Sequence, residues 1–296
     1  MTVIFDGKAF AEKKLEVLKN KVFDLRKRGV TPKLVSILVG DDPASHLYVN
    51  LKKKAAERVG AELDVRSLSA QAGMMSDVGK EEIVQLIKSL NKDQNINGIM
   101  IQLPLPKSFS IKDRDEIINS INKEKDVDGL REDSLYLTPT VKAVLEVIKE
   151  ASALPLRVRP LRVKRLSESV TYKVVVVGAR GFEGRKIFKA LKEMPFLPSG
   201  MGYEVKGVDK KTQDLKLKTR RADILISVTG SPGIIDGDCI KQGAVVIDVG
   251  SPKGDVRTEE IKGKASFISP VPGGVGPVTI SCLLENLTEA VKRQTG

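Results

Sequence analysis

The chain has 296 residues, 41% of them hydrophobic and 30% charged, with a formal net charge of +12. This length and composition are typical of a globular protein of about two domains. No apolar run approaches the roughly 18 residues of a membrane span, and the first residues lack the apolar stretch of a secretory signal, so we expect a cytoplasmic protein. His46 is the only histidine, and Cys239 and Cys282 lie far apart, which excludes the usual histidine and cysteine metal motifs.

The N-terminal half alternates apolar runs with amphipathic stretches. Apolar residues recur at helical spacing within the amphipathic stretches, and prolines or glycines mark where they end. The predicted helices cover residues 10–28, 45–55, 79–90, 111–121 and 139–150, and the predicted strands cover residues 33–39, 62–68 and 98–102. Because single helices separate successive strands, right-handed crossovers and a parallel sheet are expected.

The helix after the first of these strands carries an aromatic ring and an amine on one face. Pro43 prevents the strand from continuing, and Ser45 is the predicted N-cap of the helix. Tyr48 and Lys52 are four residues apart, so their side chains point the same way. Open α/β sheets bind ligands beyond the carboxyl ends of their strands, where this pair is expected, although such a pair alone is more often surface packing.

Two further polar features follow in the N-terminal half. Gln102 ends the third predicted strand after mostly apolar residues, and Pro104 and Pro106 prevent further ladder pairing. The loop 125–129, with the sequence Lys-Asp-Val-Asp-Gly, comes after the next helix. Taken alone, an Asp-rich turn is the favoured interpretation of this loop.

A basic, proline-containing stretch at 151–169 is the predicted connection between two domains. Its most basic part, 157–165, contains no aromatic residue on which a base could stack. A nucleic acid is therefore disfavoured as a partner. The positive net charge suits an anionic small molecule, such as a phosphorylated cofactor or a substrate with carboxylates, equally well.

The second half repeats a strand followed by glycines. Its predicted strands cover 173–177, 204–208, 224–228 and 244–249, and its predicted helices cover 185–193 and 278–293. Gly178, Gly181 and Gly184 follow the first strand as a variant of the dinucleotide fingerprint, in which glycines let backbone N–H groups approach a pyrophosphate. Asp209 ends the next strand, where an acid would bind the adenosine ribose. A Rossmann-type domain is expected, followed by an irregular segment at 270–277, rich in proline and glycine.

Motifs in four segments, in order along the chain, resemble those of the bifunctional methylenetetrahydrofolate dehydrogenase/methenyltetrahydrofolate cyclohydrolase family. They lie at 40–55, 102–106, 125–129 and 270–277, and a fifth match lies at 243–250. The resemblance implies an α/β fold of two domains with a cleft between them. The first, at 1–140, would be a folate-binding catalytic domain with a parallel sheet, completed by a C-terminal helix at 278–296, and the second, at 141–277, would be Rossmann-like. Tetrahydrofolate derivatives as substrates, NAD or NADP as cofactor and a homodimer are also implied.

The resemblance also implies the chemistry and the residues that perform it. The methylene carbon of the substrate would lose a hydride to the nicotinamide, and water would convert the methenyl product to 10-formyltetrahydrofolate. By position, Tyr48 would stack on the folate, Lys52 would transfer protons, Gln102 would orient Lys52, and Asp128 would hold the pterin. The other implied substrate-binding residues are Leu103, Pro104, Pro272, Gly273 and Gly276. The implied cofactor-binding residues are Gly178, Ala179, Arg180, Gly181, Gly184, Asp209, Lys210, Lys211, Thr229, Gly230 and Ser251.

Proton transfer by a lysine near neutral pH requires a pKa lowered from its usual value of about 10.4. We expect desolvation under bound folate to lower the pKa of Lys52. Repulsion from Lys53 and Lys54, which face other directions on the helix, would add to this effect.

The cofactor loop departs from the pattern of the family, which usually has Gly-Arg-Ser after the strand. This chain has Gly178-Ala179-Arg180 there, and Asp209-Lys210-Lys211 after the next strand. In the family the arginine of this turn reaches the 2′-phosphate of NADP, and Ala179 stands in its place here. Asp209 favours a free ribose hydroxyl and repels a 2′-phosphate, whereas Arg180, Lys210 and Lys211 would attract one. From Ala179 and Asp209 we predict that NAD is used at least as well as NADP. Three other interpretations stay open: a cyclohydrolase with weakened dehydrogenase activity, a basic nucleic-acid-binding protein on an enzyme-like fold, and a Rossmann dehydrogenase of another substrate.

Overall fold

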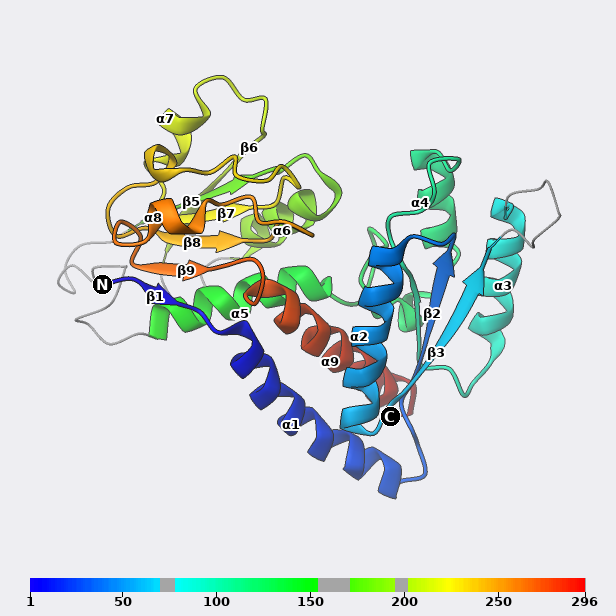
Figure 1. Cartoon of the computed structure of the whole chain (residues 1–296). Coiled ribbons are helices and arrows are strands. Elements are labelled where there is room, and N and C mark those ends of the chain that lie inside the picture. The colour runs from blue at the N-terminus through cyan, green and yellow to red at the C-terminus, as the bar shows by residue number, and fades with distance from the viewer. Residues whose placement is uncertain (70–77, 154–170, 195–201, 296) are drawn as a thin grey trace. The chain divides into compact units, whose positions relative to one another are not determined.

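The computed structural model describes residues 1–69, 78–153, 171–194 and 202–295, and the chain divides into two compact units. The six-stranded unit comprises residues 1–11 and 140–279, and the three-stranded unit comprises residues 12–139 and 280–296. Figure 1 shows that each unit is built from strands and helices, and all strand pairs are parallel. The predicted α/β class with parallel sheets is therefore confirmed. No described helix has the length and apolar character needed to span a bilayer.

The sheet of the six-stranded unit has the strand order β1-β9-β8-β7-β5-β6. In chain order these strands are β1 (Val3–Ile4), β5 (Tyr172–Val177), β6 (Tyr203–Val208), β7 (Ile224–Ser227), β8 (Val245–Asp248) and β9 (Phe267–Ser269). The strands predicted in the second half, β5 to β8, are confirmed. β1 and β9 were not predicted, because runs of two and three residues are too short for a periodic signal.

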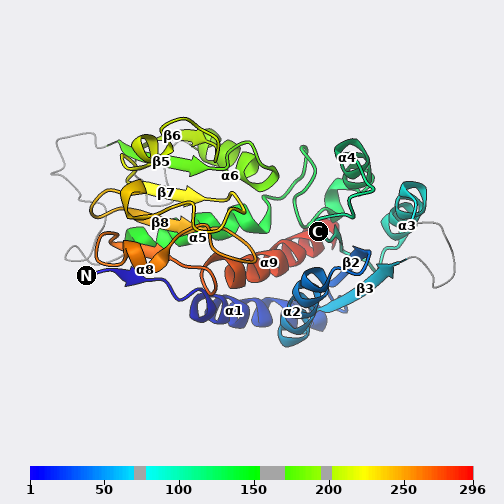
Figure 2. The same ribbon diagram turned by 45° about the horizontal axis from the view of Figure 1, so that its top comes forward.

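Buried aliphatic side chains position the carboxyl ends of the central strands in this unit. The helical segments are α5 (Pro139–Ala153), α6 (Phe182–Glu193), α7 (Leu215–Thr219), η2 (Gly237–Cys239) and α8 (Thr258–Ile261). One face of the sheet packs Val175, Leu225 and Val246 against Cys239 of η2 and Ile261 of α8. Helix α6 connects β5 to β6 and lies beside them (Figure 2). This core holds β5 and β7 side by side, so the loops that follow them are neighbours.

The three-stranded unit has the sheet order β3-β2-β4, and all of its strands were predicted. They are β2 (Lys33–Val39), β3 (Glu62–Leu68) and β4 (Gly98–Ile101). The helical segments are α1 (Gly7–Lys27), α2 (Pro43–Val59), α3 (Lys80–Lys92), α4 (Ile111–Asn119), η1 (Lys123–Lys125) and α9 (Val275–Thr295). Helices α1 and α9 each extend over both units, and they belong to this one from residues 12 and 280 onward. A core of Leu18, Leu34, Met100, Val127 and Leu287 joins helices α1 and α9 to the sheet.

The N-terminal residues pack with a different unit from the one predicted. We expected 1–140 to form one domain, whereas residues 1–11 belong to the six-stranded unit. β1 pairs with β9, and Gly7 N donates to Gly273 O at 2.8 Å. A two-residue strand gives no indication of its partner in the sequence, so only the tertiary structure reveals this assignment. Beyond Ala153, the predicted connection at 151–169, with its basic segment 157–165, lies outside the described residues.

Two helices begin earlier than predicted, within glycine-containing segments. Helix α9 begins at Val275, so the segment 270–277 is not irregular throughout. Pro277 is tolerated in its first turn because the N–H groups there have no partner within the helix. Helix α6 begins at Phe182, which places Gly184 inside its first turn.

Candidate active site

Helix α2 begins just after β2, and its start differs from the prediction in one detail. Asp42, not Ser45, is the N-cap, because Pro43 is the first helical residue and the cap is the residue before it. Asp42 Oδ2 accepts hydrogen bonds from Ser45 N at 2.8 Å and from Ser45 Oγ at 2.7 Å. This cap fixes the first turn of α2, on which Tyr48 and Lys52 depend for their direction.

The amine of Lys52 is buried inside the three-stranded unit. The residue is 8% exposed, and Nζ donates to Gln102 Oε1 at 2.9 Å and lies 3.8 Å from Met100 Sδ. Met100 lies on β4, and Gln102 directly follows that strand. The amide of Gln102 is itself oriented, because Nε2 donates to Leu103 O at 2.8 Å. Lys52 and Gln102, fifty residues apart in the sequence, therefore form a fixed amine–carbonyl pair.

Burial lowers the pKa of the Lys52 amine, and the negative charge of Asp128 opposes this shift to a smaller extent. The protein itself thus removes the amine from water, whereas we had expected bound folate to do so. Lys53 and Lys54 are exposed on other faces of α2. An amine with a lowered pKa gives up its proton more readily than an exposed lysine does, which suits a group that exchanges protons.

Tyr48, Leu103 and Pro104 lie close in sequence to the amine–carbonyl pair. Tyr48 is half-buried and lies one helical turn before Lys52 on α2. Leu103 is half-buried and Pro104 is exposed, and both follow Gln102 directly. These side chains belong to the same unit as Lys52, and each keeps part of its surface available to a ligand.

Lys125, at the start of the Asp-rich loop, has a structural role. Its buried Nζ donates to the carbonyl oxygens of Leu90, Asn91 and Asp93 at 3.0, 2.9 and 2.6 Å. These carbonyls lie at the C-terminal end of α3, where backbone acceptors lack partners within the helix and a positive charge is favourable. Lys125 therefore ties the loop to α3.

The two aspartates of this loop differ in their surroundings. Asp126 is fully buried and accepts hydrogen bonds from Leu130 N and Arg131 N, both at 3.1 Å. Burial raises the pKa of Asp126 to about 6. Asp128 is half-buried and close enough to Lys52 for their charges to interact. Of the two acids, Asp128 is the one available to a ligand.

Three predicted substrate residues, Pro272, Gly273 and Gly276, belong to the six-stranded unit instead. Pro272 is exposed, and Gly273 has φ +97°, a left-handed conformation that favours glycine. Gly276 lies in the first turn of α9. The structure thus brings Lys52, Gln102 and Asp128 together within one unit and assigns these three residues to the other.

The glycine turn after β5 fits a dinucleotide. The chain leaves β5 for β6 on one side and returns to β7 on the other, which is the switch point where open α/β sheets bind ligands. Gly178 has φ +90°, and a Cβ there would overlap with Val228 O. A Cβ on Gly184 would overlap with Gly178 O, so glycine lets the first turn of α6 pack on the turn. Backbone N–H groups at the start of α6 are thus able to approach a pyrophosphate.

Asp209, at the end of β6, contacts the glycine turn. Its carboxylate accepts a hydrogen bond from Arg180 N at 3.2 Å and forms an ion pair with Arg180 Nε at 3.1 Å. The Arg180 side chain is 91% exposed, so this ion pair is weak. Lys210 Nζ donates to Ser231 Oγ at 3.1 Å, and Lys211 is exposed. The structure therefore gathers an acid and three cations where a ribose and its substituents would lie.

Two buried acids that the sequence analysis did not single out shape the neighbouring loops. Asp255 is fully buried and accepts from Thr229 N at 2.6 Å and from Ser231 N at 3.0 Å, which fixes the loop around Gly230. Asp248, at the end of β8, accepts from Gly250 N at 2.8 Å, next to the exposed Ser251. Asp248 could have been recognised in the sequence, because it is an acid at the end of a run of apolar strand residues. No sequence pattern indicated that Asp255 is buried.

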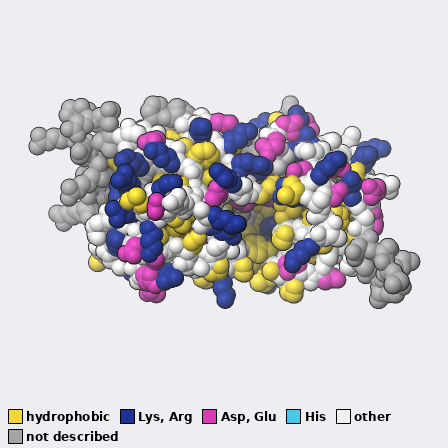
Figure 3. Space-filling view, turned by 90° about the horizontal axis from the view of Figure 1, so that it is seen from above, with side chains coloured by type: hydrophobic (Ala, Val, Ile, Leu, Met, Phe, Trp, Pro, Cys, Tyr) yellow, Lys and Arg dark blue, Asp and Glu magenta, His cyan; other side chains and the backbone are white. Residues whose placement is uncertain are grey.

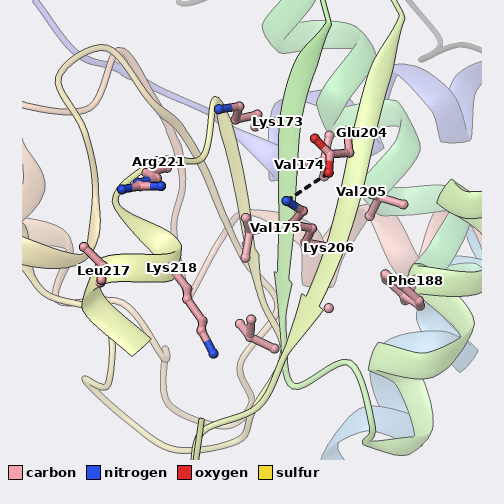
Figure 4. Close-up of a pocket in the computed structure, with 12 residues that line it drawn as sticks. Lys173, Val174, Val175, Phe188, Glu204, Val205, Lys206, Leu217, Lys218 and Arg221 are labelled. Atoms are coloured by element: carbon pink, nitrogen blue, oxygen red, sulfur yellow. Dashed lines mark ion pairs between the residues drawn. The ribbon is translucent and has the colours of Figure 1, made fainter. Parts of the chain in front are cut away.

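One cavity is lined by residues other than those predicted for the site. A cavity of about 620 Å³ is lined by residues of β5, β6, α6 and α7, among them Phe188, Leu217 and Lys218, and by Arg221, which follows α7 (Figure 4). It contains no predicted site residue.

On the face seen in Figure 3, Lys and Arg side chains are interspersed with Asp and Glu. No group of three or more residues with metal-ligand side chains occurs among the described residues.

Comparisons with known proteins cover almost the whole chain. A family model described as tetrahydrofolate dehydrogenase/cyclohydrolase, catalytic domain, matches residues 5–128. A second model, described as the NAD(P)-binding domain of the same family, matches residues 158–295. The matches thus include both the segment that carries Lys52 and the segment that carries the glycine turn.

Individual relatives agree with these matches over their full length. The bifunctional protein FolD of an Exiguobacterium species is 39% identical over 299 residues, which cover 99% of this chain and 100% of the relative. The crystal structure of the FolD methylenetetrahydrofolate dehydrogenase/cyclohydrolase from Campylobacter jejuni is 34% identical, covers 99% of both chains and has a TM-score of 0.83. The Trypanosoma brucei enzyme, solved with NADP and an inhibitor, is 30% identical, covers 99% of this chain and 98% of that chain, and has a TM-score of 0.81.

Proposed function

Because the chain belongs to the tetrahydrofolate dehydrogenase/cyclohydrolase family, we propose that the buried amine of Lys52 transfers protons in its reactions. The chain is a bifunctional enzyme of one-carbon metabolism. It oxidises methylenetetrahydrofolate to methenyltetrahydrofolate with NAD(P)⁺, and it hydrolyses the methenyl product to 10-formyltetrahydrofolate. When bound, the nicotinamide cofactor accepts the hydride of the first reaction. The second reaction needs a group that takes up and returns a proton.

The surroundings of Lys52 support this proton-transfer role. Its neutral form is favoured by burial, and a neutral amine is able to accept a proton from the water that adds to the methenyl carbon. The resulting ammonium is held by Gln102 Oε1, which accepts a hydrogen bond at 2.9 Å. Asp128 also favours the protonated form. The ammonium then returns the proton to the ring nitrogen that leaves as the five-membered ring opens.

The other proposed substrate contacts follow from position and exposure. Tyr48, one turn from Lys52, would stack on the folate ring, and the carboxylate of Asp128 would accept hydrogen bonds from the amine and ring N–H of the pterin. Leu103 and Pro104, from the same unit as Lys52, would supply further contacts. For Pro272, Gly273 and Gly276 of the other unit, a substrate-binding role stays a prediction from the family resemblance. The hydrogen bond of Lys52 to Gln102 is the observation that carries this site, because it fixes the amine at a defined point.

The measurement that tests the site is cyclohydrolase turnover in Lys52→Met. Loss of a proton-transfer group lowers such rates by about 100- to 10,000-fold. Lys53→Met, which removes an exposed lysine from the same helix, serves as the control and should retain full turnover. Full turnover in Lys52→Met would exclude Lys52 from the mechanism. Nicotinamide absorbance with methylenetetrahydrofolate reports the dehydrogenase separately, which also tests the alternative of a weakened dehydrogenase.

The family contains an NAD(P)-binding domain, and the turn after β5 has the glycines that such a cofactor requires. Gly178, Ala179, Gly181 and Gly184 would contact the pyrophosphate through backbone groups at the start of α6. The loops after β6, β7 and β8 would supply the other contacts. The proposed residues of these loops, together with Arg180 from the turn, are Asp209, Lys210, Lys211, Thr229, Gly230 and Ser251.

We further propose that NAD serves at least as well as NADP. The carboxylate of Asp209 is fixed by Arg180 N, so it would accept hydrogen bonds from a free ribose hydroxyl and repel a 2′-phosphate. The nearby cations act in the opposite direction: Lys210 donates to Ser231, and Arg180, which is 91% exposed, forms only a weak ion pair with Asp209. The ratio of kcat/KM for the two cofactors tests the proposal, and a strong preference for NADP would refute it.

A homodimer in the cytoplasm is the proposed form of the enzyme. β6 is the outermost strand of its sheet and pairs only with β5 among the described strands, so one edge is available for a second chain. Exposed Leu217 on α7 lies at the cavity beside this edge (Figure 4). Sedimentation equilibrium should give twice the chain mass of 32.3 kDa. A monomer at micromolar concentration would contradict the proposal.

A further inference from the structure

The loop that carries Asp128 is held by one buried amide from the C-terminal helix. Asn286 lies on α9 within the three-stranded unit and is fully buried. Its Nδ2 donates to Val127 O at 2.8 Å and to Leu137 O at 2.9 Å. Val127 directly precedes Asp128, so the first of these bonds fixes the peptide group that leads into Asp128.

The same two backbone segments also meet on the other side of Asp128. Gly129, which directly follows it, has φ +64°, and a Cβ there would lie 2.7 Å from Tyr136 O and 2.8 Å from Thr138 N. The backbone of 136–138 therefore packs closely on the loop. Asn286 joins the two segments with one hydrogen bond to each. Asp128 is thus held on both sides by fixed backbone.

Only the donor end of the Asn286 amide is used. Its Oδ1 is buried and has no hydrogen-bond partner among the described residues. Leaving a buried acceptor unpaired costs stability. The benefit of an amide at this position must therefore come from the two hydrogen bonds that its N–H groups donate. Those two groups hold the carbonyls of Val127 and Leu137.

We propose that Asn286 is a positioning residue for the folate-binding carboxylate of Asp128. It touches no substrate and acts through the Val127 carbonyl. A loop already held in place binds a ligand without an ordering cost, so loss of Asn286 should weaken binding of folate rather than slow the chemistry. This inference rests on the proposed function, in which Asp128 binds the pterin.

Gln294, further along the same helix, offers a matched control. Its Nε2 donates to Asn97 O at 3.0 Å and to Glu124 O at 2.9 Å, and its Oε1 accepts from Asn97 Nδ2 at 3.0 Å. These bonds tie α9 to the residue before β4 and to η1, and none involves a neighbour of Asp128 in the sequence. Gln294 is exposed, unlike Asn286, so Gln294→Leu removes three hydrogen bonds from the surface of the same helix without releasing Asp128.

The test is a double-mutant cycle of Asn286→Leu and Asp128→Asn in the full chain. Dehydrogenase kinetics give kcat and the KM for methylenetetrahydrofolate, and thermal unfolding gives stability. Asn286→Leu is expected to raise KM about tenfold with kcat retained, as for the loss of a uniform binding interaction. If Asn286 acts through Asp128, the KM of the double variant for methylenetetrahydrofolate should be no higher than that of Asp128→Asn alone. Gln294→Leu should lower the unfolding temperature and leave KM unchanged.

Additive effects of the two substitutions on KM would overturn the inference, and so would an equal rise of KM in Gln294→Leu. An unchanged KM in Asp128→Asn has a different meaning, because it would refute the role of Asp128 in the proposed function. If Asn286→Leu does not fold, Asn286→Ser replaces it in the cycle. A serine hydroxyl can donate to only one of the two carbonyls, so a smaller rise of KM with the same non-additivity is expected.

Discussion

Replacement of Lys52 by methionine should change how the stability of the protein depends on pH. Burial lowers the pKa of the Lys52 amine in the folded protein, whereas the unfolded chain has the usual value of about 10.4. Between these two pKa values the unfolded chain binds more protons than the folded protein, so wild-type stability rises with pH. Below the folded pKa both states carry the proton, and the cost of burying the ammonium is fully present. Methionine binds no proton, so the variant lacks this dependence.

The size of the effect follows from linkage. Within the window between the two pKa values, the free energy of unfolding of the wild type should rise by up to about 1.4 kcal/mol per pH unit relative to Lys52→Met. The variant also loses the hydrogen bond to Gln102 Oε1, which leaves a partly buried acceptor without its donor. That loss of about 1–3 kcal/mol shifts the whole curve without creating the slope. Groups that titrate in both proteins contribute equally to the two free energies of unfolding, so their contributions cancel when one is subtracted from the other.

Urea unfolding at a series of pH values, from about pH 7 to just above the unfolded pKa of about 10.4, measures this difference. The curves for wild type and Lys52→Met should diverge in favour of the wild type as pH rises. Lys53→Met, which removes an exposed lysine from the same helix, is measured alongside as the control for the loss of a lysine side chain. A difference between wild type and Lys52→Met that stays constant across the window would refute the lowered pKa, and with it the physical basis for proton transfer by Lys52.

Three further substitutions test other parts of the structure. Gly178→Ala introduces a Cβ that overlaps with Val228 O, at a residue whose φ is +90°. It should lower the free energy of unfolding, measured in urea, by about 2–5 kcal/mol, and it should raise the KM for the cofactor. Wild-type stability and KM would contradict the requirement for glycine. Asp209→Ser removes repulsion of a 2′-phosphate and should raise the NADP to NAD ratio of kcat/KM about tenfold, whereas an unchanged ratio would show that Asp209 does not select the cofactor. Lys125→Met leaves three carbonyls at the end of α3 without their donor and should cost about 2–4 kcal/mol in urea unfolding. The exposed Lys123→Met is its control, and equal losses would contradict the role of Lys125.

The sequence by itself determined the features that depend on residues close together in the chain. Apolar periodicity located the strands of both sheets that are four or more residues long, and Pro43 marked the end of β2, although the predicted start of the next helix at Ser45 was two residues late. The turn after β5 was equally local, because the conformation of Gly178 is one that only glycine adopts without strain. The helical spacing of Tyr48 and Lys52 required no tertiary information. The family was identified from a resemblance instead, carried by the motifs at 40–55, 102–106, 125–129, 243–250 and 270–277.

Only the tertiary structure decided which distant groups meet. Nothing near Lys52 in the sequence indicates whether its amine is buried or solvated, and the amine is buried because β4 brings Met100 and Gln102 to it. The contact of Asn286 with Val127 gave no signal, because a buried asparagine on a helix has no pattern of its own. β1 became a strand only through pairing with β9. Burial, pKa and hydrogen-bond partners follow from how the hydrophobic core packs the elements together, and that packing is a property of the whole fold.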